Sequence, residues 1–194
     1  MRPSHSLKSL FISVTRQKLL GVFFSQPREI FYVRQLVRLV DEEINSVRRE
    51  LKNLLSGSII TSEVRGNRVY YGANPKSWLF TDLLTLTAKV SNLATDIKSN
   101  QPKIGKVEVM VYSFSYLCGE SSSNGIDIVI VGEISLKALE VMVKKEETRL
   151  GREVDYMVMD RSEFRLRRQK RDPVIVDLFL NSPSIIIGCP SDIY

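Results

Sequence analysis

The residues of this sequence that could do chemistry are cationic and amide side chains that gather between residues 41 and 71. A guanidinium group forms two parallel hydrogen bonds with a phosphate or a guanine edge, and an asparagine amide does so with adenine. The candidates for base contacts are Asn45, Ser46, Arg48, Arg49 and Lys52. Further along the chain, Arg65 and Arg68 flank a glycine-asparagine pair and are candidates for phosphate contacts. These residue types and spacings indicate recognition of a nucleic acid.

The apolar residues of the same segment predict the helix that would present these side chains. They recur at spacings of three and four, as on one buried face: Ile44, Val47, Leu51, Leu54 and Leu55. The cationic candidates then share the opposite, solvent-facing side with Asn45. Asp41 and Glu42 are predicted to begin the helix as N-cap and first-turn acids, and Gly57 is predicted to end it.

Two runs with strand propensity follow this helix and predict a hairpin. They are Ile59–Val64 and Arg68–Tyr71, and Gly66-Asn67 between them suits a two-residue turn. A helix with a cationic outer face followed by a cation-tipped hairpin is typical of a winged helix-turn-helix, whose helix enters the major groove while the hairpin lies over the backbone. The alternative is an ordinary amphipathic helix and hairpin whose charges are simply solvated.

The residues upstream predict three elements that would support this helix. Thr15 is expected to cap a first helix that ends at Ser25-Gln26-Pro27, and Glu29–Tyr32 indicates a short strand. Val33–Val40 predicts a short helix whose outward residues are Arg34, Gln35 and Arg38. We expect Arg34 and Gln35 to lie against DNA phosphates, where they would position the protein without reading sequence.

This succession of elements, with Arg49-Glu50-Leu51, Leu54 and a hairpin that ends in VYYGANP, resembles the ArsR-like winged-helix regulators. The resemblance covers roughly residues 10–75 and rests mostly on core positions. It implies a winged helix-turn-helix domain over residues 1–74 that binds double-stranded DNA and regulates transcription. Winged helices also dock proteins, so a protein–protein module is an alternative.

The distribution of charge agrees with a polyanionic partner. The whole chain of 194 residues carries a net charge of +6. Residues 1–75 hold 12 basic and 6 acidic residues, whereas the remainder holds 16 of each. The excess of positive charge therefore lies in the part of the sequence that predicts the helix and hairpin, as binding to a polyanion requires.

Other functional classes find little support in the composition. No apolar run approaches the length of about 20 residues that a membrane-spanning helix needs, and the N-terminus lacks a signal-peptide pattern. Cys118 and Cys189 make neither a disulfide framework nor a metal site, and the single His5 lies near the N-terminus. We therefore expect a cytoplasmic protein without a metal or cofactor.

A connecting helix is predicted over residues 75–101. Asn74-Pro75 can open it, and its apolar residues follow a heptad-like spacing: Leu79, Leu83, Leu86, Val90, Leu93 and Ile97. Such a seam could pair two chains into a homodimer, which is the state we expect. It could equally pack onto the domains of its own chain.

The second half of the sequence alternates strand and helix patterns and predicts an α/β domain over residues 102–194. Tyr112–Gly132 and Gly151–Pro173 resemble the minimal nucleotidyltransferase fold. In that family a Gly-Ser turn accepts phosphates and an Asp-x-Asp pair on the next strand holds metal ions. The overall fold class expected is thus α+β with two domains, an N-terminal winged helix and a C-terminal nucleotidyltransferase-like domain, joined by a helix.

The departures from this second resemblance predict that catalysis has been lost. Gly125 replaces the first aspartate of the pair, Phe114 replaces the glycine of the turn, and Cys118 replaces an arginine. The remaining positions, Ser115, Asp127 and Asp155, are a poor cradle for a metal. We expect no catalytic residues here, and a domain used for oligomerisation, sensing or partner docking. The alternative is an active, antitoxin-like nucleotidyltransferase that modifies a protein or RNA, and a nucleotide ligand is left open.

Overall fold

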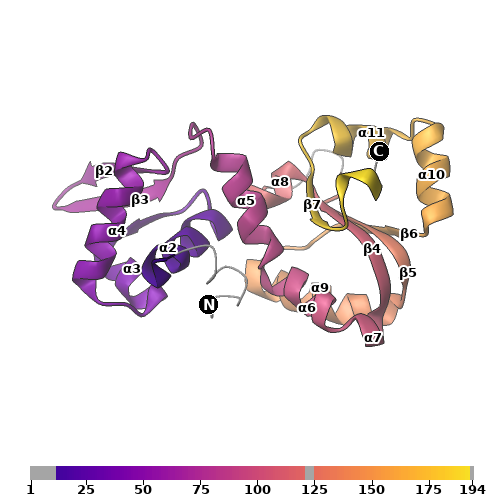
Figure 1. Cartoon of the computed structure of the whole chain (residues 1–194), viewed down its shortest axis with the longest axis horizontal. Coiled ribbons are helices and arrows are strands. Elements are labelled where there is room, and N and C mark those ends of the chain that lie inside the picture. Colours follow the sequence, from indigo (N-terminus) through magenta and orange to yellow (C-terminus); the bar gives the residue numbers. More distant parts are fainter. Residues whose placement is uncertain (1–11, 121–124, 193–194) are drawn as a thin grey trace. The chain divides into compact units, whose positions relative to one another are not determined.

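The computed structural model describes residues 12–120 and 125–192 of the 194-residue chain. The fold is mixed α+β with two separate sheets (Figure 1). The chain divides into two compact units, Met1–Thr87 and Ala88–Tyr194. No helix in the described ranges combines the length and apolar character needed to cross a bilayer.

Residues 12–79 of the first unit form three helices and a small antiparallel sheet. In chain order these are α2 (Val14–Ser25), β1 (Ile30–Tyr32), α3 (Val33–Val40), α4 (Ile44–Ser56), β2 (Ile60–Arg65) and β3 (Arg68–Ala73). The strands lie in the order β1-β3-β2. The predicted helices, strand and hairpin are confirmed to within two residues, but the first helix is capped by Ser13, whose side chain accepts a hydrogen bond from the Arg16 amide, and not by Thr15.

The core of the first unit is formed by the apolar faces of the three helices. Leu19 and Phe23 of α2, Leu36 of α3, and Val47 and Leu51 of α4 are all at most 1% exposed. Burying side chains of this size contributes about 1.5–3 kcal/mol each before conformational entropy is subtracted. This packing fixes which side of α4 faces outward, and it is the side that carries the cationic residues.

Hydrogen bonds between α2 and the turn before α4 hold that turn in place. Lys18 Nζ donates to Glu42 Oε1 at 2.6 Å and to the Val40 carbonyl at 2.8 Å, while Thr15 Oγ1 donates to Glu42 Oε2 at 3.3 Å. The hydrogen bond from Lys18 holds the pKa of Glu42 below its ordinary value. The turn that joins α3 to α4 is therefore tied to α2.

Both ends of α4 differ by a residue or two from those predicted. Glu43 is the N-cap, and its carboxylate accepts hydrogen bonds from the amides of Asn45 and Ser46 at 2.8 and 3.1 Å. Asp41 instead ends α3 in the left-handed conformation. At the other end Gly57 has a φ of −84°, and Ser58, with a φ of +53°, is the left-handed residue that stops the helix.

Replacing Ser58 by glycine should stabilise the protein. The left-handed conformation is held by hydrogen bonds from the Ser58 and Ile59 amides to the carbonyls of Leu55 and Leu54, and glycine adopts it without the Cβ strain of serine. We expect Ser58→Gly to raise the free energy of unfolding by about 0.5–1 kcal/mol in urea denaturation. Ser56→Gly, within the helix, is the matched control and should lower it. Equal effects of the two substitutions would contradict this explanation.

The hairpin after α4 has the predicted two-residue turn. Arg65 pairs with Arg68 across it, and Val64 with Val69. Gly66 has a φ of +57°, whereas Asn67 does not have a positive φ. A positive φ at the first central residue alone is the pattern of a type II′ turn, which matches the twist of the two strands. The hairpin therefore places two arginines side by side at its tip.

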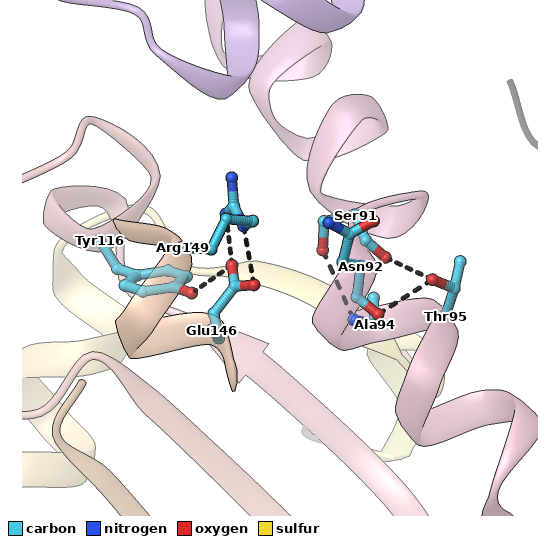
Figure 2. Close-up of polar contacts among 7 residues, drawn as sticks. All are labelled: Ser91, Asn92, Ala94, Thr95, Tyr116, Glu146 and Arg149. Carbon is cyan, nitrogen blue, oxygen red and sulfur yellow. Dashed lines mark hydrogen bonds and ion pairs between the residues drawn. The ribbon is translucent and has the colours of Figure 1, made fainter. Parts of the chain in front are cut away.

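The prediction of one continuous connecting helix is wrong. Asn74 Oδ1 accepts a hydrogen bond from the Lys76 amide in a turn, and three short helices follow, α5 (Phe80–Lys89), α6 (Asn92–Ser99) and α7 (Gln101–Ile104). The Ser91 hydroxyl caps α6 by accepting from the Ala94 amide at 3.4 Å (Figure 2). Because Ser91 has extended backbone angles, the helix stops there and the heptad seam is interrupted.

The second unit is built on a four-stranded mixed sheet. Its strands are β4 (Gly105–Tyr112), β5 (Ile128–Ile134), β6 (Tyr156–Met159) and β7 (Ser184–Ile187), and its helices after α7 are α8 (Phe114–Leu117), α9 (Leu136–Leu150), α10 (Arg161–Gln169) and α11 (Pro173–Leu180), followed by the short 3-10 helix η1 (Pro190–Asp192). The strand order is β6-β5-β4-β7, with β5 and β6 parallel and the other pairs antiparallel. The predicted alternation of strands and helices over residues 102–194 is confirmed, but two strands begin later than the sequence pattern predicts: β5 begins at Ile128 and not at Ile126, and β6 begins at Tyr156 and not at Val154.

The two faces of this sheet bury different sets of residues. Val109, Val111, Val129 and Val131 pack in one cluster with Phe164 of α10 and with Ile175 and Leu178 of α11. Met110, which alternates with them along β4, is fully buried and so faces the other side. The sheet is therefore covered on both faces.

Candidate nucleic-acid interface

The first unit has a groove lined by four arginines. Arg34 and Arg38 reach it from α3, Arg48 from the first turns of α4, and Arg68 from the start of β3. Its volume is about 690 Å³, and its other lining residues are Tyr32, Val33, Ile44, Asn67, Val69 and Tyr71. Among the residues that the structure describes, none that lines this groove is acidic.

The positive charge of the groove is not neutralised within the described part of the chain. None of its four arginines forms an ion pair with a carboxylate among residues 12–120 and 125–192. Four guanidinium groups around one hollow repel one another, and an anion bound between them would relieve that repulsion. The groove therefore suits phosphate groups.

The outer face of α4 adjoins this groove through Arg48. Asn45, Arg48, Arg49 and Lys52 are all exposed, and their spacing of three, one and three places them on one side of the helix. Ser46 is only partly exposed. Because an α-helix fits the major groove of B-form DNA, this row of donors has the dimensions to face base edges.

Of the remaining predicted contact residues, some have side chains that already bond to other protein groups, and others line the groove. Arg65 forms an ion pair with Glu63 at 2.6 Å and does not line the groove. Gln35 uses its side-chain oxygen to accept a hydrogen bond from the Tyr32 amide at 3.0 Å, which caps α3. Of the nine predicted contact residues, the groove thus brings together Arg34, Arg48 and Arg68.

Sequence reasoning placed Arg38 on the outer face of its helix but left it out of the predicted contacts. Its spacing of four from Arg34 on α3 would have indicated that the two share a face. Tyr32 and Tyr71 were missed for another reason. They reach the groove through the pairing of β1 with β3, in which Phe31 lies opposite Tyr71, and no local pattern predicts that register.

The vestigial nucleotidyltransferase positions do not form a cradle for a metal. Asp127 is 1% exposed, and its Oδ2 accepts a hydrogen bond from Arg152 Nη1 at 2.8 Å. Asp155 is exposed, and its backbone carbonyl accepts from the Asp127 and Ile128 amides. In the described ranges no three His, Cys, Asp or Glu side chains are grouped as metal ligands. A guanidinium holds the carboxylate that a metal would need, so the residues present do not fit Mg²⁺.

Gly125 does not stand on the strand where the resemblance implies a second carboxylate. It lies three residues before β5 and has a φ of +71°. Residues two apart on a strand point to the same side, but Gly125 and Asp127 both precede β5, so this geometry does not apply to them. An aspartate introduced at Gly125 would adopt a strained left-handed conformation.

A second buried carboxylate, Glu146 of α9, lies close to the ion pair of Asp127 with Arg152. Figure 2 shows it between Arg149, which donates to it through Nε at 2.9 Å, and the hydroxyl of Tyr116, which lies 3.4 Å from Oε1. The Arg152 guanidinium lies 5.2 Å from the centre of the Tyr116 ring. Burial, reinforced by the negative charge of Glu146, raises the pKa of Tyr116, so its hydroxyl stays protonated. Tyr116 thus contacts both ion pairs, Glu146 with Arg149 and Asp127 with Arg152, and we interpret this buried cluster as structural.

Comparisons of the chain with protein-family models, with curated proteins and with solved structures found no match.

Proposed function

We propose that this protein is a sequence-specific regulator that binds duplex DNA through the four-arginine groove and the outer face of α4. The observation that carries the proposal is the groove, which the described part of the chain lines with four guanidinium groups and no carboxylate. The order of elements in the first unit, with the hairpin β2–β3 after α4, supports a winged helix-turn-helix.

The proposed contacts divide between reading and positioning. Asn45, Arg48 and Arg49 would face base edges in the major groove, where donors of this kind distinguish guanine and adenine. Lys52 lies on the same side of α4, three residues after Arg49, and would lie next to these base contacts. Arg34, Arg38, Arg65 and Arg68 would bind phosphates on either side, which fixes the register of the protein on the duplex.

The salt dependence of binding tests this proposal. Each phosphate neutralised by the protein contributes about −0.9 to the slope of log affinity against log salt concentration. The four arginines assigned to phosphates, Arg34, Arg38, Arg65 and Arg68, therefore predict a slope of about −3.6. Fluorescence anisotropy with labelled genomic fragments, measured at several salt concentrations, gives this slope. Absence of binding at low salt would overturn the proposal.

We propose that the second unit serves oligomerisation, sensing or partner docking, and does not transfer a nucleotidyl group. The ion pair of Asp127 with Arg152 supports this. Of the two remaining aspartates, Asp127 is the buried one, and its carboxylate already binds a guanidinium in place of a metal ion. Incubation with labelled nucleoside triphosphates, Mg²⁺ or Mn²⁺, and candidate protein and RNA acceptors should give no labelled product. Label transfer that disappears in Asp127→Ala would favour the enzyme.

A homodimer is the second part of the proposal. Leu86 and Val90 are partly exposed, whereas Leu93 is 2% exposed and belongs to the core of its own unit, so it is no longer a candidate for pairing. Replacing Leu86 and Val90 together by glutamate is expected to shift the mass in light scattering from two chains to one. Lys89→Glu, exposed in the same helix, is the control and should leave the mass unchanged. A wild-type protein that is monomeric at tens of micromolar contradicts the dimer.

A further inference from the structure

Two tyrosines and two arginines form a continuous row across the hairpin and β1. Tyr32 of β1 lies directly opposite Tyr70 of β3, and their ring centres are 5.9 Å apart in an edge-to-face arrangement. The guanidinium of Arg68 lies 4.8 Å from the centre of the Tyr32 ring, and that of Arg65 lies 6.0 Å from the Tyr70 ring. Each arginine at the hairpin tip thus rests on one of two rings that support each other.

The two arginines differ in what their donors already contact. Arg65 gives its Nε to Glu63 at 2.6 Å. The side chain of Arg68 forms no hydrogen bond or ion pair within the described ranges, although it lies over Tyr32 and lines the groove. A contact with the face of a ring uses no N–H group, so all five donors of Arg68 are available to a ligand.

Contact with a ring also lowers the cost of ordering the arginine. A free arginine side chain carries about 2 kcal/mol of rotamer entropy, which is lost when it is fixed on a ligand. A cation–π contact at an exposed site contributes about 0.5–1 kcal/mol, so Tyr32 offsets part of that loss before a ligand arrives. Because the rings of Tyr32 and Tyr70 pack edge to face, the ring that holds Arg68 is itself oriented.

We propose that Tyr32 is a positioning residue that holds Arg68 ready to bind a DNA phosphate at the groove. This inference rests on the proposed function, because it names how one of the phosphate contacts is prepared. Tyr32 acts through Arg68, and its ring, not its hydroxyl, performs this role. Arg65, already paired with Glu63, is the weaker ligand of the two.

The test is a double-mutant cycle on binding to random duplex DNA. Tyr32→Leu removes the ring while keeping apolar volume, and should weaken binding about two- to fivefold, the equivalent of one exposed cation–π contact. Tyr32→Phe keeps the ring and should bind like the wild type. Adding Tyr32→Leu to Arg68→Gln should cost nothing further. Multiplicative losses in the double variant would overturn the proposal, as would weak binding by Tyr32→Phe.

A measurement on the unsubstituted protein covers the case in which Tyr32→Leu does not fold. Nitrogen-15 relaxation of the arginine Nε–H groups in the free protein should show Arg68 to be more ordered than Arg34 and Arg48, neither of which lies over a ring of residues 12–120 or 125–192. Equal mobility of the three would overturn the positioning role. If the wild type binds no DNA, the proposed function fails. If it binds and the cycle is multiplicative, the inference about Tyr32 alone fails.

Discussion

Replacing Arg34, Arg38 and Arg68 together by glutamine is expected to weaken binding to every duplex DNA by about two orders of magnitude near 0.1 M salt. The slope of log affinity against log salt is negative, and it should become less steep by about 3 at the same time, because three phosphate contacts are lost. These side chains line the groove without a carboxylate partner in the described ranges, so glutamine removes their charge without leaving an unpaired acid. Anisotropy titrations on random DNA measure both quantities.

A control with the same change in net charge separates the groove from a general electrostatic effect. Arg165, Lys170 and Arg171 are exposed in the second unit, and replacing these three by glutamine also removes three positive charges. This variant should keep most of the affinity and the slope. Equal losses in the two triple variants would show that only the net charge matters, and the groove would no longer be the binding site.

The residues of α4 should behave differently from those of the groove wall. Arg49→Ala is expected to reduce the preference for a selected site over random DNA by about 1–3 kcal/mol, the discrimination supplied by one arginine on a guanine. Its effect on random DNA should be smaller than that of the triple variant. Equal losses on the two DNAs would remove Arg49 from base recognition.

The second large effect expected is the loss of stability when the ion pair in the second unit is broken. Arg152→Met would leave Asp127, with a side chain only 2% exposed, without its cation. An unpaired buried carboxylate costs about 3–5 kcal/mol, a large part of the 5–15 kcal/mol that stabilises a domain of ordinary size. Urea denaturation followed by circular dichroism should show this loss.

The double variant Arg152→Met with Asp127→Leu should recover most of the lost stability. Apolar groups of similar volume often replace a buried ion pair without cost, and Asp127 Oδ1 has no hydrogen-bond partner in the described ranges to lose. Arg161→Met breaks the more exposed pair with Glu108 and should cost less than about 1 kcal/mol. Similar losses in Arg152→Met and Arg161→Met would contradict the structural role given to Asp127.

Local patterns predicted most of the elements of this fold. The apolar period of α4 and the Gly66-Asn67 turn are properties of adjacent residues, and both elements appear where expected. The prediction of one connecting helix failed because the heptad spacing continues through Ser91, while the extended backbone of that residue interrupts the helix and its hydroxyl caps the next one, α6. Ser91-Asn92 is itself an N-cap signal, so a cap was detectable at that point.

The candidate sites were predictable to a smaller extent. The charge and spacing of Arg34, Arg48 and Arg68 marked them as contacts, but their convergence on one groove depends on how α3, α4 and β3 pack. Arg152, which is 25 positions from Asp127, meets it only because β5 and β6 pair in parallel. Such pairings have no signature in the local sequence.

The hydrogen bonds from Lys18 and Thr15 to Glu42 have a consequence for the heat-capacity change of DNA binding. They join the turn between α3 and α4 to α2, so the two helices that carry Arg34, Arg38 and Arg48 are already held in place before DNA binds. Association with DNA then needs no coupled folding in this region, and it should lack the large negative heat-capacity change that accompanies the burial of a newly folded segment. In calorimetry the enthalpy of binding should therefore vary little with temperature.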